Sequence, residues 1–598
     1  MQAKTLIEMF LEVVKKHGNK TSLMKKVEGK YQGFSYNEFG ERVKNFALGL
    51  AALGIKAGDR VGLMSENRPE WAISDFAILA IGATNVPIYP TITPLQIEYI
   101  LKDSGAKMII VSTPELMAKM LEIFDNLPDL QKVIYMDDIE ALKDFMIRYD
   151  EIYDMGKAFA KNHPGYYEDQ VKAVTPDDLC GIIYTSGTTG APKGVMLTHS
   201  NLLSNVTAAL EVVKADETDT FLSFLPLCHS FERMAGHFTA IGAGSTIAYA
   251  ESVDTVAQNL GEVKPTLMAS VPRLFEKIYA RIIESAEAGS PLKKKIFWWA
   301  IRTGEKYVTA KFAGKIPAFL NFKNNLAKKL VFSKLQQRVG GNLRFFVSGG
   351  APLPKEIGEF FYKAGILILE GYGLTETSPV ITVNREEKFK FGSVGPVVPG
   401  VEVKIAEDGE VLTRGPHVMK GYYKNPEATA ETIDKNGWLH TGDIGIMDEE
   451  GLLYITDRKK NIIVTSGGKN VTPATIENLL ATSPYIEQVM VVGDRRNYLT
   501  ALIVPKFATL KKYAAEHGIV FSSIEELLKN KTIYDTMDAD IQKLTASLAR
   551  FEQLKKFALL PKEFTVESGE LTPTLKVKRK VVSEKYAAVI EKMYQSDK

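Results

Sequence analysis

The segment Tyr184–Asn201, with the sequence YTSGTTGAPKGVMLTHSN, decides how this chain is interpreted. A short apolar run, Gly181–Thr185, leads into it and predicts a buried strand. Between Thr185 and Gly194 the following loop holds three glycines, four hydroxyls and one lysine. Glycine lets backbone N–H groups face a ligand, hydroxyls donate to phosphate oxygens, and lysine adds a positive charge. The composition therefore predicts a nucleotide-phosphate loop that includes Thr185, Ser186, Gly187, Thr188, Thr189, Gly190 and Lys193.

The residues around Lys193 exclude one common kind of phosphate loop. A Walker loop places Gly-Lys-Ser/Thr at the start of a helix, whereas here Pro192 precedes the lysine and Gly194 follows it. Kinase-type and GTPase-type mechanics are therefore not expected. A flexible turn rich in serine, threonine and glycine is the structural alternative, but ten consecutive positions of this composition after a buried strand favour a nucleotide site.

Length and composition set the broad class of the protein. The 598 residues predict about four structural units, and a 45% hydrophobic share excludes wholesale disorder. The 74 basic and 72 acidic residues nearly cancel, so no overall field favours nucleic acid. Two cysteines, Cys180 and Cys228, cannot build a disulfide framework. The charged N-terminus does not have the pattern of a signal peptide and no apolar run reaches about 18 residues, so we expect a cytoplasmic enzyme.

Up to about residue 380 the chain alternates helical patterns, such as Pro94–Lys102, with short apolar runs. Runs this apolar suit parallel strands covered by helices on both faces, so we expect layered α/β subdomains. The predicted strands are Lys107–Ser112, Val133–Met136, Gly181–Thr185, Phe345–Ser348 and Gly365–Leu369.

Two later changes in composition and in the pattern of apolar residues predict the rest of the fold. A portion rich in glycine and proline, about 385–456, predicts antiparallel β-structure in the form of a distorted barrel, with strands at Val401–Ile405 and Glu410–Arg414. A small α+β domain should follow the charged run Asp457–Lys460. In that domain we expect paired strands at Val489–Val492 and Leu502–Val504, and helices between Phe507 and Phe557.

Three further motifs follow the loop in order along the chain. They are Gly371–Glu376 (GYGLTE), Thr441–Asp443 (TGD) and Asp457–Arg458, which opens DRKKNIIVTSGGKN. With Tyr184–Asn201 they resemble the adenylate-forming superfamily, which includes acyl-CoA synthetases, peptide-synthetase adenylation domains and firefly-type luciferases. The resemblance spans nearly the whole chain, and four motifs in the family's order argue against an accidental match.

The resemblance implies a site for ATP and Mg²⁺. It assigns Thr188, Thr189 and Lys193 to the departing β- and γ-phosphates. Glu376 takes the metal position, where one carboxylate together with phosphate oxygens is the usual coordination. Tyr372 would stack on adenine. The other implied nucleotide-binding positions in these two motifs are Thr185, Ser186, Gly187, Gly190, Gly371, Gly373 and Thr375, the last as a donor to the α-phosphate.

Further nucleotide contacts are implied by the later motifs. Asp443 resembles the ribose ligand, although an aspartate in such a turn is often only a turn former. Arg458 would touch ribose or phosphate, with a solvated charge run as the alternative. Gly349, Gly350 and Ala351, from the sequence SGGAP, resemble the loop that closes over adenine; a plain strand-ending turn is the alternative there.

The resemblance also implies a moving C-terminal domain. It makes 457–460 a hinge between a large domain, 1–456, and a mobile α+β domain, 461–598. Gly467 and Gly468 would approach the pantetheine arm of CoA after rotation. Lys576 matches the terminal catalytic lysine. Many relatives have glycine immediately before this lysine, whereas this chain has Leu575, as the long-chain branch does. Luciferase-like members carry a second lysine where this chain has Val464, which disfavours luminescence.

Two segments point to the acid that is activated. Pro226–Met234 (PLCHSFERM) and Ala269–Phe275 (ASVPRLF) resemble long-chain fatty acyl-CoA synthetases. His229 would position the carboxylate or gate an acyl tunnel, with a structural role as the alternative. Cys228 is expected to be a small buried residue. Neither segment offers an aspartate for a substrate amino group, which disfavours amino acids.

The sequence thus predicts an enzyme that converts a fatty acid and ATP to acyl-AMP and pyrophosphate, then passes the acyl group to CoA. An acyl carrier protein as acceptor remains open, as does a homodimer. A non-catalytic lipid-binding protein on the same fold is the rival from another class. The four charges Lys193, Glu376, Asp443 and Lys576 argue against it.

The segment 291–330 combines ten lysines and arginines with seven aromatic residues, and Glu305 is its only acidic residue. Basic helices with an aromatic face are typical of membrane-surface binding, so peripheral membrane association is one interpretation. The other is a solvated helical face whose aromatic side chains pack inward.

Overall fold

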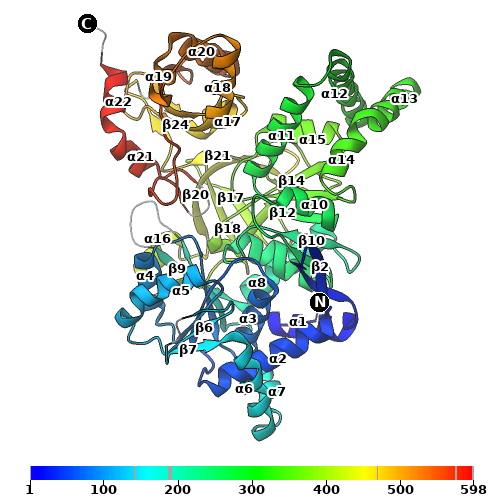
Figure 1. Cartoon of the computed structure of the whole chain (residues 1–598), viewed down its shortest axis with the longest axis vertical. Helices are drawn as coiled ribbons and strands as arrows, with labels where there is room; N and C mark the ends of the chain where they lie inside the picture. Colours follow the sequence, from blue (N-terminus) through cyan, green and yellow to red (C-terminus); the bar gives the residue numbers. More distant parts are fainter. Residues whose placement is uncertain (1, 141–142, 186–191, 468, 573–575, 596–598) are drawn as a thin grey trace.

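We describe the fold from a computed structural model of the chain, which covers residues 2–140, 143–185, 192–467, 469–572 and 576–595. The chain forms two large sheets, a smaller antiparallel sheet and a C-terminal α+β unit, and the strands of the two large sheets alternate along the sequence (Figure 1). Within these residues no helix is both long and apolar enough to cross a bilayer.

The first large sheet has eight strands and is mostly parallel. All residues of β4 and β5 are buried, as expected for strands covered on both faces. One edge is antiparallel because β8 turns back into β9. The spatial order is β19 (Gly421–Tyr422), β9 (Lys193–Thr198), β8 (Leu179–Thr185), β4 (Thr84–Ile88), β3 (Arg60–Met64), β5 (Met108–Val111), β6 (Lys132–Tyr135) and β7 (Met146–Arg148).

The second large sheet has the same number of strands, with one antiparallel strand at each edge. Its six inner strands are parallel. The order is β15 (Val380–Val383), β14 (Leu367–Gly373), β13 (Phe345–Ser348), β12 (Leu267–Ser270), β10 (Thr220–Ser223), β11 (Thr246–Tyr249), β1 (Thr21–Val27) and β2 (Lys30–Ser35).

Helix α3 (Pro69–Ala80) lies at the centre of the core that joins the two large sheets. Eleven of its twelve residues are buried, so it is apolar on almost every side. Its buried carboxylate, Asp75, accepts hydrogen bonds from Arg233 Nε at 3.0 Å and Nη2 at 2.5 Å. A charge withdrawn from water requires such a partner, so Arg233 of the PLCHSFERM motif has a structural role.

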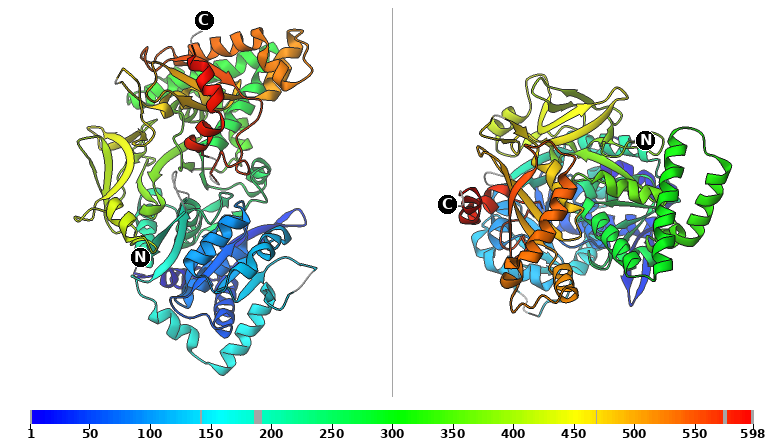
Figure 2. Two further views of the ribbon diagram at one scale, coloured as in Figure 1. Left: turned by 90° about the vertical axis from the view of Figure 1, so that its left-hand side faces the viewer. Right: turned by 90° about the horizontal axis from the view of Figure 1, so that it is seen from above.

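The other helices of this part cover the outer faces of the sheets or connect their strands (Figure 2). They are α1 (Leu6–His17), α2 (Tyr36–Ala52), α4 (Pro94–Ser104), α5 (Pro114–Ile123), α6 (Tyr149–Asn162), α7 (Tyr166–Ala173), α8 (His199–Val213), α9 (Thr239–Gly242), α10 (Val256–Val263), α11 (Pro272–Glu287), α12 (Pro291–Phe312), α13 (Ala318–Ala327), α14 (Ser333–Arg338) and α15 (Lys355–Lys363).

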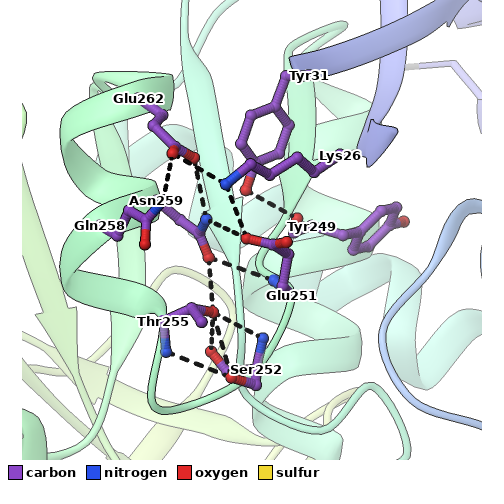
Figure 3. Close-up of polar contacts among 9 residues, drawn as sticks. All are labelled: Lys26, Tyr31, Tyr249, Glu251, Ser252, Thr255, Gln258, Asn259 and Glu262. Carbon is purple, nitrogen blue, oxygen red and sulfur yellow. Dashed lines mark hydrogen bonds and ion pairs between the residues drawn. The ribbon is translucent and has the colours of Figure 1, made fainter. Parts of the chain in front are cut away.

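A polar network fastens the first hairpin, β1–β2, to the rest of the second sheet. Lys26 Nζ lies 3.0 Å from Glu251 Oε2 and 2.9 Å from Glu262 Oε1, and Asn259 donates to both carboxylates (Figure 3). Tyr31 donates to the backbone oxygen of Tyr249 at 3.1 Å. These contacts link the hairpin to β11 and α10.

The glycine- and proline-rich portion forms a five-stranded antiparallel sheet. The order is β16 (Gly395–Pro396), β21 (Leu452–Arg458), β20 (Leu439–Met447), β18 (Glu410–Arg414) and β17 (Glu402–Ile405), and α16 (Pro426–Thr432) lies in the connection between β18 and β20.

The C-terminal unit has hydrophobic clusters of its own. The predicted pair of strands is present as β24 (Ile486–Val492) and β25 (Leu499–Pro505). Three helices lie between Phe507 and Phe557, as predicted, and the last residues of that range belong to a strand, β26 (Leu554–Leu559), which pairs in parallel with β25. The other elements are β22 (Ile463–Val464), β23 (Asn470–Val471), α17 (Pro473–Ala481), α18 (Phe507–Glu516), α19 (Ile524–Lys529), α20 (Lys531–Thr545), α21 (Arg579–Lys585) and α22 (Ala587–Tyr594). The predicted fold class is confirmed.

Helices α12 and α13 form a hairpin that projects from the large domain (Figures 1 and 2). Phe297 is buried in the core, and Trp298 and Trp299 pack against it. Phe319 and Phe322 instead face solvent. The inward-packing interpretation therefore holds for the first half of 291–330 and fails for the second half.

Candidate active site

A cavity of about 1420 Å³ lies between the large domain and the C-terminal unit. Elements from distant parts of the chain contribute to its wall. Thr185 comes from β8, Tyr372 from β14, Thr441 from β20, Arg458 from the end of β21 and Lys576 from the segment before α21. The structure thus brings the predicted motifs together at one cavity.

Lys193 and Glu376 both contact one tyrosine, Tyr422. Lys193 Nζ lies 5.0 Å from the centre of the Tyr422 ring, and the Tyr422 hydroxyl donates to Glu376 Oε1 at 2.9 Å. Burial, with Glu376 as the second cause, raises the pKa of Tyr422, so this hydroxyl stays protonated and remains a donor. Tyr422 thereby fixes a cation and a carboxylate at the same wall of the cavity.

The sequence analysis missed Tyr422. The residue lies in β19, a strand of only two residues whose partner is β9. A segment this short has no periodicity to read, and its pairing is a tertiary contact. Only the register, Tyr422 beside Val195, places it next to β9, the strand that begins at Lys193.

Two predicted glycines have a packing reason in the structure. A Cβ at Gly373 would lie 1.7 Å from the backbone oxygen of Pro379, so only glycine allows β14 to pass there. A Cβ at Gly349 would lie 3.0 Å from the Phe231 ring. Gly349, Gly350, Gly371 and Gly373 all line the cavity.

Asp443 lies directly behind the cavity wall and is held by two residues that form it. Tyr372 donates to Asp443 Oδ2 at 2.7 Å, and Arg458 Nε lies 3.0 Å from Asp443 Oδ1. Arg458 pairs with Asp443 in the register of β20 and β21, which fixes their approach. Burial raises the pKa of Asp443, while Arg458 and the Tyr372 hydrogen bond oppose that shift.

Lys576 borders the cavity from the C-terminal side. Atoms of both domains surround it, although water still reaches it through the open cavity. Desolvation and then the Arg458 cation lower the pKa of Lys576 to about 8, and Asp443 opposes the shift. At neutral pH most of the lysine is therefore charged. Backbone contacts hold this segment: Thr572 N donates to Lys576 O at 2.8 Å, and Leu571 and Val577 form an antiparallel bridge.

His229 and Ser230 of the PLCHSFERM motif also line the cavity. His229 Nδ1 accepts from the backbone N–H of Phe231 at 3.1 Å, so neutral His229 carries its proton on Nε2. Desolvation, with Lys576 as the second cause, lowers the pKa of His229 to about 4. Ser230 Oγ lies 3.1 Å from Thr375 Oγ1 and links this motif to GYGLTE.

Part of the cavity wall is apolar and is contributed by the second large sheet and its neighbouring helices; we call this part the apolar arm. Its lining side chains come from α8, the helical turn after Ser230, and strands β10, β12, β13 and β15. They are Ala209, Val213, Phe221, Met234, Ala235, Leu267, Val347, Val380 and Val383. Cys228 is buried beside this region and its burial raises the pKa of the thiol, so it behaves as a small apolar residue.

Not every predicted residue is placed at the cavity. Ser186, Gly187, Thr188, Thr189, Gly190 and Gly468 lie outside the described residues. Ala351 and Gly467 are exposed and do not line the cavity. Among the described residues no group of three histidine, cysteine, aspartate or glutamate side chains converges. The single carboxylate Glu376 fits a magnesium ion whose other ligands come from phosphates.

Comparisons with known proteins agree with this arrangement. A family model described as AMP-binding enzyme matches residues 10–423, and one described as AMP-binding enzyme C-terminal domain matches 460–598. The chain is similar to a long-chain-fatty-acid–CoA ligase of Mycobacterium bovis, with 38% identity over 96% of this chain and 94% of that protein. It is 34% identical to a peroxisomal long chain acyl-CoA synthetase of Arabidopsis thaliana, over 95% of this chain and 82% of that protein.

Among solved structures, the chain is similar to the adenylation domain of a carboxylate reductase from Mycobacterium chelonae. The TM-score is 0.77 at 22% identity, over 99% of this chain and 92% of that one. This likeness concerns the fold, whereas the family matches cover most of the sequence itself. The predicted resemblance is confirmed: the chain belongs to the AMP-binding enzyme family.

Proposed function

We propose that this enzyme activates a long-chain fatty acid with ATP and transfers the acyl group to CoA. The carboxylate attacks the α-phosphorus of ATP, which gives acyl-AMP and releases pyrophosphate. The CoA sulfur then attacks the acyl carbon, which gives acyl-CoA and releases AMP. The apolar part of the cavity lining carries the proposal, because its side chains come from the strands of the second large sheet and from the turn that follows His229 and Ser230. The two relatives named above, both described as acting on long-chain acids, support the substrate class.

The main obstacle in the first step is repulsion between two anions, the carboxylate and the polyphosphate. Lys576, Arg458 and Lys193 surround the cavity with positive charge. Fixed charges of this kind stabilise the negative charge that develops in the transition state. We assign the α-phosphate and carboxylate oxygens to Lys576, and the departing phosphates to Lys193 with Thr188 and Thr189 of the loop.

His229 is suited to hold the fatty acid carboxylate. Because its pKa is about 4, it is neutral at physiological pH and donates from Nε2. A neutral donor orients the carboxylate without forming an ion pair that would make its oxygen a poorer nucleophile. His229 therefore serves as a positioning donor at the mouth of the apolar arm.

Glu376 would hold Mg²⁺ beside the β- and γ-phosphates, and Tyr422 orients this carboxylate. When bound, the ion neutralises charge on the leaving pyrophosphate. We assign ribose to Asp443 and adenine to Tyr372, Gly349 and Gly350.

The second step requires a different arrangement of the domains. We propose that 461–598 rotates about 457–460 relative to 1–456, which withdraws Lys576 and brings Gly467 and Gly468 to the CoA arm. Arg273 of α11 forms an ion pair with Glu487 of β24 across the domains. This contact belongs to the closed state and must break on rotation.

A panel of acids from short to very long tests the proposal, with pyrophosphate release measured with CoA and with a holo acyl carrier protein. We expect the highest kcat/KM for long acids, and a thioester of CoA. If a thioester forms only on the carrier protein, the acceptor is the carrier protein and not CoA. A folded protein that forms no acyl-AMP from any fatty acid with ATP and Mg²⁺ would disprove the chemistry.

A further inference from the structure

The outer side of the α12–α13 hairpin carries a set of exposed apolar side chains far from the active site. We call it the tip face. Its members, with exposed fractions, are Ile316 (37%), Phe319 (69%), Phe322 (67%), Leu326 (41%) and Leu330 (41%). All nine residues from 311 to 319 are exposed, and they connect the two helices.

The spacing of these residues places them on one side of the second helix. Phe319, Phe322 and Leu326 follow at intervals of three and four along α13, which is one face of a helix. Ala327 is turned the other way and is buried, and Phe332 beyond it packs into the core. The helix is therefore held by its inner side, while its outer side presents two phenylalanines to solvent. Isolated exposed apolar residues are ordinary, but a contiguous set of this kind marks an interaction surface.

The charge around the tip face is of one sign. From Lys306 to Lys355 the sequence contains no aspartate or glutamate. Lys323 lies over the Phe319 ring with its Nζ 4.4 Å from the ring centre. The other basic residues of this stretch, up to the end of α14, are Lys306, Lys311, Lys315, Lys328, Lys329, Lys334 and Arg338.

We propose that the tip face docks on a lipid bilayer that carries anionic headgroups. An apolar helix face flanked by lysines matches the boundary of a bilayer, where apolar side chains enter the acyl region and lysines reach the phosphates. Each lysine near an anionic surface adds to the attraction. The side chains of Phe319 and Phe322 insert into the acyl region of the bilayer. The preference for anionic headgroups comes from Lys315, Lys323 and the pair Lys328 and Lys329 that follows α13.

A second copy of this chain is a poorer occupant. A two-fold symmetric contact brings the same patch of both copies together, so the basic stretch would face itself without a carboxylate to balance it. An anionic lipid surface satisfies both the apolar and the charged parts of the face at once.

Docking at this face leaves the catalytic machinery free. Between Ala269 and Val347 no described residue lines the active-site cavity. The inference therefore does not depend on the proposed reaction, and lipid binding and catalysis can be measured separately.

Flotation of the full-length protein with vesicles tests the inference. The two vesicle types contain phosphatidylcholine alone, or phosphatidylcholine with about one third phosphatidylglycerol. We expect the protein to float with the anionic vesicles only. Phe319→Ser with Phe322→Ser should lower the partition coefficient by roughly tenfold or more, and Lys315→Glu with Lys323→Glu should abolish the preference for anionic lipid.

Matched variants elsewhere on the surface serve as controls. Val520→Ser removes an apolar side chain that is 92% exposed, and Lys511→Glu with Lys512→Glu reverses two exposed lysines of α18. Both should float like the unaltered protein. Equal flotation of the tip-face variants and the unaltered protein would overturn the proposal. So would a concentration-dependent dimer that the tip-face variants abolish in the absence of lipid binding.

Discussion

Arg579 Nη2 lies 2.5 Å from Glu477 Oε1 and ties the segment just after Lys576 to helix α17. The same carboxylate oxygen accepts from the backbone N–H of Val491 at 2.7 Å, and Arg579 Nη1 donates to Val491 O at 2.9 Å. Two partners, Glu477 Oε1 and Val491 O, therefore fix the position of Arg579. Arg579 follows Lys576 by three residues, so its contacts with Glu477 and Val491 hold the segment that carries the lysine. Glu477 itself does not line the cavity.

The first prediction concerns this pair. Glu477→Gln should lower the rate of acyl-AMP formation by about tenfold or more, because a shift of the lysine costs transition-state stabilisation. Conversion of supplied acyl-AMP to acyl-CoA should change much less. Stopped assays of the two half-reactions give both rates.

The control is Glu591→Gln, which removes the ion pair of Glu591 with Arg496 in the same domain and should leave both rates unchanged. Equal losses in the two half-reactions of Glu477→Gln, at an unchanged melting temperature, would contradict a positioning role.

The second prediction concerns pH. The cation of Lys576 is the active form, and its pKa of about 8 means that the cation is lost as pH rises through that value. The kcat/KM for pyrophosphate release, which reports the free enzyme, should be level from about pH 6 to 7 and fall above about pH 8. Lys576→Arg should remove the fall, because arginine stays charged. A fall near pH 8 that persists in the arginine variant would assign the titration to another group.

The third prediction concerns Tyr422. Tyr422→Phe removes the hydrogen bond that orients Glu376. The loss of a single hydrogen bond of this kind changes a binding constant by roughly three- to tenfold. We expect the concentration of Mg²⁺ for half-maximal activity to rise by about that factor, with little change in protein stability. The neighbouring Tyr423→Phe, which does not line the cavity, should behave like the unaltered enzyme. An unchanged Mg²⁺ dependence in Tyr422→Phe would remove this role.

The fourth prediction concerns the apolar arm. Ala209 of α8 lines it, and Ala209→Trp would fill part of its volume. The preferred acid should become shorter by several carbons. Each methylene of the acyl chain that is no longer buried loses about 0.8 kcal/mol of binding free energy, which lowers kcat/KM roughly fourfold. Activity with a short acid is the internal control and should be retained. An unchanged length profile would show that the acyl chain takes another path.

The sequence predicted the strongly apolar elements well. Phe345–Ser348 is β13 with the same bounds. Buried parallel strands are continuous apolar runs, so their pattern is visible without the partner strands. Leu554–Leu559 was not predicted, because Lys555 and Lys556 interrupt its apolar run and its strand form depends on pairing with β25.

The site was predictable where a motif carries it. Tyr372, Glu376, Arg458 and Lys576 all reach the cavity. The bond from Tyr372 to Asp443 was not predictable, because it joins two sheets across a tertiary contact. The same holds for Tyr422. Motifs identify the residues of a site, whereas the partners that orient them come from the packing of separate elements.

The two bonds to Asp443 have a consequence for nucleotide choice. Tyr372 occupies one carboxylate oxygen and Arg458 the other, so the plane of the carboxylate is set before any nucleotide arrives. In the proposed function the remaining lone pair of each oxygen would accept from one of the two ribose hydroxyls. With ribose assigned to Asp443 in this way, we expect the enzyme to favour ATP over its 2′-deoxy counterpart.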